Sequence, residues 1–165
     1  MAAVPGASSV EVARRWFTRL HDGRELAAWR LMTEGMRGAY VDGWARMVAH
    51  FSSGPITGQL PRPLREDLIV RPDRVTPAPD MWLSLRDYLR GVVREAIPWA
   101  THEGAAWVDT PRPVSVDREA AVLVCLPPGP RRTQIVSAVA VMLQLVPEGW
   151  RIDGFDDAAE HPSAL

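Results

Sequence analysis

Three polar residues are candidates for acid–base chemistry. Asp109 and Asp153 lie in predicted strands, and Tyr40 lies in a predicted helix. A carboxylate in an apolar cavity has a raised pKa and can act as a general acid or base near neutral pH. A tyrosine hydroxyl could donate a hydrogen bond to a substrate carbonyl. The simpler interpretation is that each aspartate is an exposed carboxylate on a strand and that Tyr40 packs in an amphipathic helix.

The chain is rich in tryptophan, with seven among 165 residues. Several tryptophans lie on apolar faces of predicted elements, where they pack a core or line a cavity for a flat hydrophobic ligand. The residues assigned to such a ligand pocket are Trp16, Trp29, Trp44, Trp107 and Met142.

Several kinds of chemistry are excluded by residues that the chain lacks. It contains no lysine, which codon bias in a GC-rich genome explains most simply, so Schiff-base and pyridoxal-phosphate chemistry are ruled out. Cys125 is the only cysteine, so an internal disulfide and a multi-cysteine zinc site are excluded. The four histidines are not at metal-ligand spacing, and no phosphate-binding loop occurs. We therefore expect neither a metal nor a cofactor.

The charge and hydropathy of the chain narrow its partners and its location. A net charge of −1 gives no electrostatic footprint for nucleic acid or an anionic membrane. The N-terminus does not resemble a secretory signal, and the longest nearly apolar run, residues 135–146, is too short to span a bilayer as a helix. We expect a cytoplasmic protein.

Helices are predicted in the first part of the chain. "SSVE" is a capping box in which Ser8 and Glu11 satisfy each other's backbone N–H groups, and it opens an amphipathic helix. Further helices are expected in residues 24–33, after which Gly35 ends the helix, and in residues 36–51, with Phe51 facing inward. The proline-rich segment 52–80 disfavours a long helix, and its residues 66–72 suggest a short edge strand. Asp80 caps the clearest helix, which ends before Pro98.

From Ala105 onward the apolar period changes to two, which predicts strands. They cover residues 105–109, 118–126, 133–146 and 149–155, and the last three form an antiparallel meander. Residues 111–116 either continue the first strand through a bulge or connect it to the next. Helices followed by a meander indicate an α+β fold, with helices packed on one face of a curved antiparallel sheet. We expect flexible tails at residues 1–7 and 158–165 around a single domain at 8–157.

The strand at residues 135–146 is apolar on both faces. One parity carries Val139, Val141 and Leu143, and the other carries Ala138, Ala140 and Met142. An antiparallel strand with one wet face should alternate between apolar and polar residues, so we expect both faces of the sheet to be covered. The middle segment of the chain could cover the second face, as could a second copy in a two-fold dimer.

The order of these segments resembles a known family. The helix "VARRWFTRLHDG" leads directly to "RELAAWRLM", and the chain closes with "GWRIDGF". This pattern resembles the nuclear transport factor 2-like superfamily, the cystatin-like cone fold of ketosteroid isomerase and the SnoaL-like proteins, over residues 9–157. The resemblance implies a sheet wrapped by N-terminal helices into a cone around a mostly apolar cavity. It departs from the isomerase pattern, because the first helix carries Trp16 and Phe17 where that pattern has a tyrosine.

Two functions follow from this resemblance and remain open at the level of sequence. The first is a non-catalytic module that forms a homodimer through its sheet and binds a protein partner or a hydrophobic small molecule. The second is a small cofactor-free cyclase, isomerase or dehydratase that acts on a hydrophobic, polyketide-like substrate. In the second, Asp109 or Asp153 would be the base and Tyr40 the hydrogen-bond donor.

Overall fold

The computed structural model describes residues 6–51, 60–75, 79–97, 105–125 and 137–157. These residues form five α-helices, one short 3-10 helix and five strands, which confirms the predicted α+β class. The chain divides into two compact units, residues 1–33 with 96–165 and residues 34–95. The expectation of one domain over residues 8–157 stays a prediction, and the tails predicted at 1–7 and 158–165 lie almost entirely outside the described residues.

The first unit begins with α1 (Ser9–His21), and its capping box forms as predicted. The Ser8 side chain accepts a hydrogen bond from the backbone N–H of Glu11 (3.3 Å), and the Glu11 carboxylate accepts one from the backbone N–H of Ser8 (2.8 Å). The helix ends at His21, Asp22 is its C-cap, and Gly23 after it adopts a φ of 73°. Glycine takes this left-handed conformation without steric cost, so it terminates the helix cleanly.

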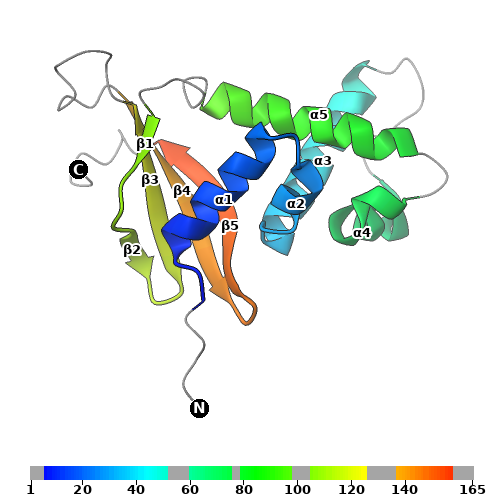
Figure 1. Cartoon of the computed structure of the whole chain (residues 1–165). Coiled ribbons are helices and arrows are strands. Elements are labelled where there is room, and N and C mark those ends of the chain that lie inside the picture. The colour runs from blue at the N-terminus through cyan, green and yellow to red at the C-terminus, as the bar shows by residue number, and fades with distance from the viewer. Residues whose placement is uncertain (1–5, 52–59, 76–78, 98–104, 126–136, 158–165) are drawn as a thin grey trace. The chain divides into compact units, whose positions relative to one another are not determined.

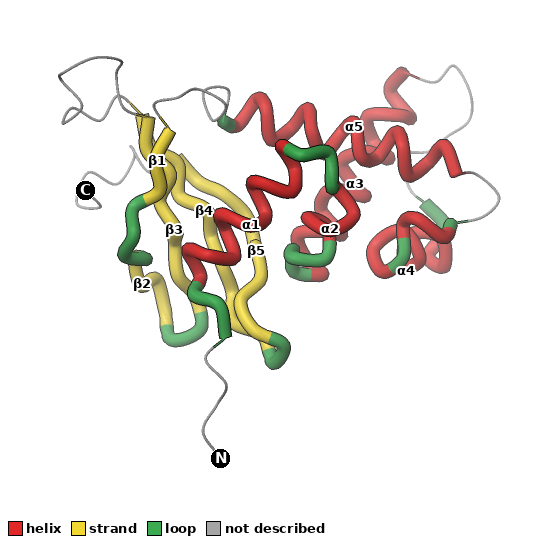
Figure 2. The backbone as a smooth tube through the Cα atoms, in the orientation of Figure 1, coloured by secondary structure: helices red, strands yellow, loops and turns green. Residues whose placement is uncertain are grey.

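The five strands form one curved, unclosed antiparallel sheet (Figures 1 and 2). Along the sheet the order is β1-β3-β4-β5, and β2 also pairs with β3. The register confirms the predicted meander of the last three strands. The segment 111–116, for which the sequence allowed two interpretations, contains a separate strand. The pairing of this strand with β3 has a register shift between Pro113 and Ser115. The strands are β1 (Ala105–Trp107), β2 (Arg112–Ser115), β3 (Arg118–Cys125), β4 (Ser137–Val146) and β5 (Gly149–Asp157).

The helix α2 (Glu25–Trp29) is shorter than the helix predicted for residues 24–33. Beyond it the chain runs parallel to β5, where Met32 bridges Ile152. The backbone N–H of Thr33 donates to the carbonyl of Ile152 (2.7 Å), and the N–H of Ile152 donates to the carbonyl of Leu31 (2.8 Å). These bonds to the sheet replace the helical ones, so residues 31–33 cover part of the edge of β5.

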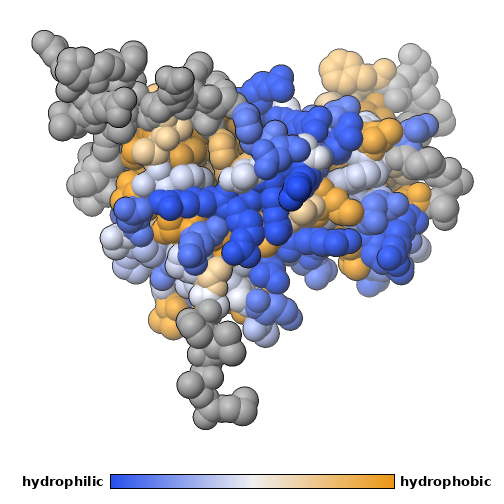
Figure 3. Space-filling model, in the orientation of Figure 1, coloured by the Kyte–Doolittle hydropathy of each residue, from blue (hydrophilic) through white to orange (hydrophobic). Residues whose placement is uncertain are grey.

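One face of the sheet is covered by α1, which crosses β3, β4 and β5 (Figure 1). The indole of Trp16 lies 6.1 Å from the ring of Phe155, and the Ser9 hydroxyl donates a hydrogen bond to Glu119. Hydrophilic side chains gather on the outward side of α1 (Figure 3), which is therefore amphipathic. Fully buried apolar residues of this α1 face include Trp16, Ala121, Leu123, Val141, Leu143 and Ile152.

The opposite face of the sheet is also buried where β3 ends and β4 begins. Val122, Val124 and Ala138 form a cluster there, and each is less than 7% exposed. Neighbouring Val139 on the α1 face is buried too, so the two-faced apolar pattern of β4 agrees with burial on both sides. Nearer the β4–β5 hairpin the opposite face is only half-buried, at Met142.

The second unit consists of helices. It contains α3 (Glu34–Phe51), α4 (Arg62–Val70), the 3-10 helix η1 (Pro72–Arg74) and α5 (Pro79–Ala96). Within it, the Trp44 indole N–H donates to the Ser84 hydroxyl (2.9 Å), which joins α3 to α5. Leu85 and Leu89 on the predicted stripe of α5 are fully buried. Within the described residues, no helix has both the length and the apolar character needed to cross a bilayer.

Four predictions for this unit are wrong. Asp80 does not cap α5 but lies in its first turn, because the helix begins at Pro79. The expected strand at 66–72 is mostly α4, because prolines at the start of a helix occupy positions whose N–H needs no partner. Gly35 does not end a helix but lies in the first turn of α3. Phe51 does not face inward, since it is 79% exposed.

The ion pair between α3 and α4 should make stability depend on pH. Arg65 donates two hydrogen bonds to Asp42 (2.7 and 2.8 Å) and so lowers the pKa of Asp42. A lowered folded-state pKa gives stability that is complete above the unfolded pKa of about 3.9 and is lost as the pH falls through the folded pKa. Because both side chains are about 40% exposed, we expect a contribution below about 1 kcal/mol.

Urea denaturation at neutral pH and at about pH 3 measures this contribution. The free energy of unfolding should fall less on acidification in Asp42→Asn than in the wild type. Arg65→Gln should behave in the same way as Asp42→Asn. Equal losses on acidification in the wild type and both variants would show that this pair does not contribute.

Gly43 on α3 leaves room for the Tyr88 side chain. A Cβ at residue 43 would lie 2.5 Å from the Tyr88 hydroxyl oxygen. Gly43→Ala gains about 1 kcal/mol of helix propensity but must displace a packed ring, which typically costs about 1–3 kcal/mol. We expect a net loss of about 1 kcal/mol in thermal or urea unfolding, and a smaller loss when Gly43→Ala is made in a Tyr88→Phe background. An additive double-mutant cycle would contradict the predicted clash.

Candidate functional site

Tyr40, the candidate hydrogen-bond donor, is buried in the helical unit. It lies on α3 with 7% of its surface exposed, and its ring meets that of Tyr88 edge to face at 6.3 Å. Burial, and secondly the nearby Tyr88, raise the pKa of Tyr40 well above its ordinary value. The phenol therefore keeps its proton at any physiological pH, so it can donate a hydrogen bond but cannot act as a base.

Asp109, the first candidate base, lies in solvent. The strand β1 ends at Trp107, two residues earlier than its predicted end, so Asp109 belongs to the connection to β2. Its side chain is 91% exposed and forms an ion pair with Arg14 of α1 at 2.7 Å. The apolar surroundings that the catalytic hypothesis requires are absent around this carboxylate, and its contact ties a sheet connection to α1.

Asp153, the second candidate base, lies at an irregularity in β5. Ile152 pairs with Leu143 and Gly154 pairs with Met142, so Asp153 is the additional residue between the two pairs. Its carboxylate accepts a hydrogen bond from the Thr33 hydroxyl (2.8 Å), and its other oxygen lies 3.4 Å from a guanidinium nitrogen of Arg118.

The contacts of Asp153 join three segments that are distant in sequence. Thr33 belongs to the segment that runs along the edge of β5, and Arg118 begins β3 on the other side of β4. The Asp153 side chain is 23% exposed, so this is the more enclosed of the two candidate carboxylates. Its geometry is that of a structural cross-link between the 31–33 segment and the sheet.

The structure gives the three candidate catalytic residues separate partners. Tyr40 belongs to the unit of residues 34–95, whereas both aspartates belong to the other unit. Within that unit Asp109 contacts α1, and Asp153 contacts residue 33 and β3. The hydrogen bonds and ion pairs of the described residues thus do not join the two aspartates to each other.

Of the residues assigned to a ligand pocket, Trp107 and Met142 lie on opposite faces of the sheet. Trp16, Trp29 and Trp44 are at most 4% exposed, which agrees with core packing. Trp107 is half-buried and lies 6.2 Å from the Phe17 ring, on the α1 face of the sheet. Met142 pairs with Ala120 and Gly154 on the opposite face, so it does not share a pocket with Trp107.

Sequence reasoning missed the partners of these residues. Nothing in the local sequence signals that Thr33 or Arg118 would meet Asp153, because such contacts arise only from strand pairing. The same holds for Ser9 and Glu119, which are 110 positions apart. The buried indole N–H of Trp16 has no hydrogen-bond partner among the residues that the structure describes.

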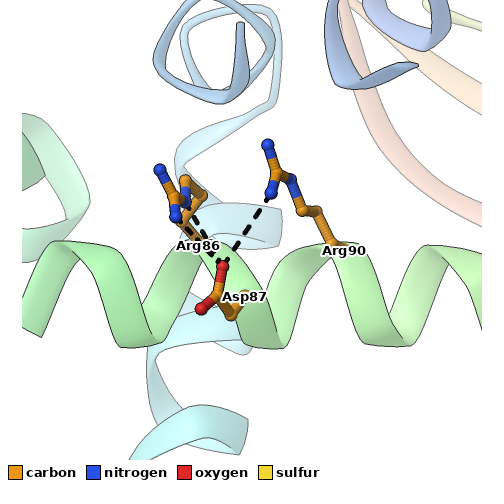
Figure 4. A network of polar contacts seen from close by, with 3 residues as sticks. All are labelled: Arg86, Asp87 and Arg90. Carbon is orange, nitrogen blue, oxygen red and sulfur yellow. Dashed lines mark hydrogen bonds and ion pairs between the residues drawn. The ribbon is translucent and has the colours of Figure 1, made fainter. Parts of the chain in front are cut away.

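A network of polar contacts also lies on α5. Arg86 and Arg90 both approach the carboxylate of Asp87, at 3.3 and 4.0 Å (Figure 4). Asp87 is 64% exposed, and ion pairs of this kind contribute little to stability. Among the described residues no group of three or more His, Cys, Asp or Glu side chains is placed to hold a metal ion.

If Asp153 is a structural cross-link, its removal should destabilise the fold. We expect Asp153→Ala to lower the free energy of unfolding by about 1–2 kcal/mol, because the Thr33 and Arg118 contacts are lost from a partly buried site. Asp109→Ala is the matched control and should show no measurable loss, since its carboxylate is exposed. Chemical denaturation measures both variants, and equal stability of the two would contradict the structural assignment.

Comparison with known proteins adds no further assignment. The chain matches no family model, no curated protein and no solved structure. The roles of these residues are therefore inferred from their geometry and chemistry.

Proposed function

We propose that this chain is a non-catalytic binding module of the cone-fold type that dimerises through its sheet and binds a protein partner or a hydrophobic small molecule. The observation that carries the proposal is that the two candidate bases have separate structural partners. Asp109 pairs with Arg14 in solvent, whereas Asp153 cross-links the 31–33 segment to the sheet. General acid–base catalysis requires groups that converge on one substrate.

The cone-fold assignment is supported by the arrangement of the first unit. There α1 lies across a curved antiparallel sheet, and the last strand, β5, lies at the end of the strand order. The alternative, a cofactor-free cyclase, isomerase or dehydratase, would use Asp109 or Asp153 with Tyr40. The contacts of these residues give it less support.

The surface we assign to the dimer is the half-buried part of the sheet face opposite α1. We call it the β4–β5 patch, and it combines apolar or small residues with polar ones next to the Arg118–Asp153 pair. Cross-strand pairing places its members on one face: Ala140, Met142, Gln144, Arg151 and Gly154.

This patch meets two requirements of a two-fold interface. Such an interface presents the same surface from both copies and must therefore be self-complementary. The apolar centre at Ala140 and Met142 can meet itself, while Arg118 and Asp153 supply opposite charges at the margin. The part of the same face where β3 ends and β4 begins, at Val122 and Ala138, is already buried within one chain, so the patch is the part that remains for a partner.

A hydrophobic ligand or partner segment has a different candidate surface, the half-buried aromatic side chains of the α1 face. Phe17 and Trp107 meet there at 6.2 Å, and Phe155 packs against the same buried cluster. Aromatic side chains have a large apolar area and lose little conformational entropy when they bind, which suits them to binding surfaces.

Gly154→Arg tests the dimer without disturbing the single chain. A Cβ at residue 154 would meet no atom within 4 Å, so we expect the variant to fold, whereas two arginines facing each other across a two-fold axis should separate the copies. We expect the wild type to be a dimer and Gly154→Arg a monomer in light scattering over a range of concentrations. Val116→Arg, at a fully exposed hairpin position outside the patch, should remain dimeric.

Circular dichroism of all three proteins separates dissociation from unfolding. A wild type that is monomeric at every concentration would show that the dimer is wrong. A folded Gly154→Arg that stays dimeric would show that the dimer uses another surface.

A further inference from the structure

Three Asp-Gly steps in this chain share a reactive chemistry. They are Asp22–Gly23, Asp42–Gly43 and Asp153–Gly154. In such a step the backbone nitrogen of glycine can attack the carboxyl carbon of the aspartate, because glycine has no Cβ to shield it. A carbon–nitrogen bond forms, and the carboxyl C–OH bond breaks. The hydroxyl leaves with the amide proton as water, which gives a succinimide.

Hydrolysis of the succinimide restores the mass of the chain. One water adds at either imide carbonyl and yields aspartate or isoaspartate, in which the main chain runs through the former side chain. No oxidant, reductant or cofactor is needed. The structure therefore decides which of the three steps can reach the ring-closing geometry.

Two of the steps are held away from that geometry. Both carboxylate oxygens of Asp42 accept hydrogen bonds from Arg65, at 2.7 and 2.8 Å, and Gly43 lies within α3. The carboxylate of Asp153 is held by Thr33 and Arg118, and Gly154 pairs with Met142 in the sheet. Ring closure at either step would break these contacts as well as the regular backbone.

Asp22 differs from both in its surroundings. It is exposed at the end of α1, and its carboxylate has no hydrogen bond or ion pair with any residue that the structure describes. The N–H of Gly23 donates to the carbonyl of Leu20 at 3.3 Å, a long hydrogen bond, and Gly23 has a φ of 73°. Neither reacting group is held firmly, and helix ends open at low cost.

We propose that Asp22 is a site of spontaneous isomerisation to isoaspartate in the folded protein. Isoaspartate adds one methylene to the main chain at the end of α1. The turn there is held by hydrogen bonds from the N–H of Asp22 to Thr18 (2.9 Å) and from that of Arg24 to Arg19 (2.7 Å), which the longer backbone would disturb. The modification would thus change the connection between α1 and α2.

Ageing of the full-length protein at physiological pH and temperature tests this site. The chain lacks lysine, so trypsin cleaves it only after arginine and places the three steps in separate peptides, residues 20–24, 38–46 and 152–165. Electron-transfer fragmentation and labelling by an isoaspartyl methyltransferase measure isoaspartate in each peptide. In the folded protein we expect peptide 20–24 to exceed the other two by about tenfold or more.

The same ageing in urea shows whether the fold causes the difference. Unfolded chain should accumulate isoaspartate at similar rates in all three peptides. In the folded protein Asp22→Glu should abolish the signal in peptide 20–24, because a longer side chain does not form the five-membered ring, and Arg65→Gln should raise the signal in peptide 38–46.

Two results would overturn the proposal. One is a folded-state signal in peptide 38–46 or 152–165 that equals that of peptide 20–24. The other is a peptide 20–24 that stays unmodified in the folded protein while it reacts in urea. The isoaspartate content measured in the folded protein and in urea does not depend on whether the chain dimerises or binds a ligand.

Discussion

The packing of α1 across β3, β4 and β5 is the interaction on which the rest of the first unit depends. Trp16 is completely buried on this interface, together with Val141, Leu143 and Ile152 from the middle of the sheet. Loss of a buried side chain of this size typically costs about 3–5 kcal/mol, a large part of the stability of a small unit. The sheet curves around this helix, and the segment 31–33 can pair with β5 only because α1 and α2 bring it to that edge.

Polar contacts at the margins of this core fix its register. The Ser9–Glu119 and Thr33–Asp153 contacts each tie the N-terminal segment to a different part of the sheet. The apolar interior can tolerate small sliding movements, whereas each of these pairs forms only in one alignment. Asp153, a candidate base in the sequence, makes one of these contacts, and this supports the binding interpretation that we propose.

The opposite face of the sheet carries small and apolar residues but is not uniform. Val122, Val124 and Ala138 are buried within the single chain, while Met142 and its neighbours toward the β4–β5 hairpin remain half-buried. The two-faced apolar pattern of β4 thus has two physical origins in our interpretation. Burial within the chain accounts for the apolar residues in the first half of β4, and the proposed self-association accounts for those in the second half. Apolar surface left in water on a sheet would favour such association.

The sequence alone determined the α+β class, the capping box at Ser8, the stripe of α5 and the meander from β3 to β5. Each of these follows from contacts between residues close in sequence or from a simple apolar period. The prediction from sequence was wrong at residues 66–72, because a short apolar run fits strand and helix equally well and the prolines were given too much weight. Tertiary structure alone decided that Thr33 and Arg118 meet Asp153, that Tyr40 packs with Tyr88, and that Trp107 and Met142 lie on opposite faces. These relations join residues far apart in the chain, and no local pattern encodes them, because they depend on strand register and helix packing that form only when the whole unit folds.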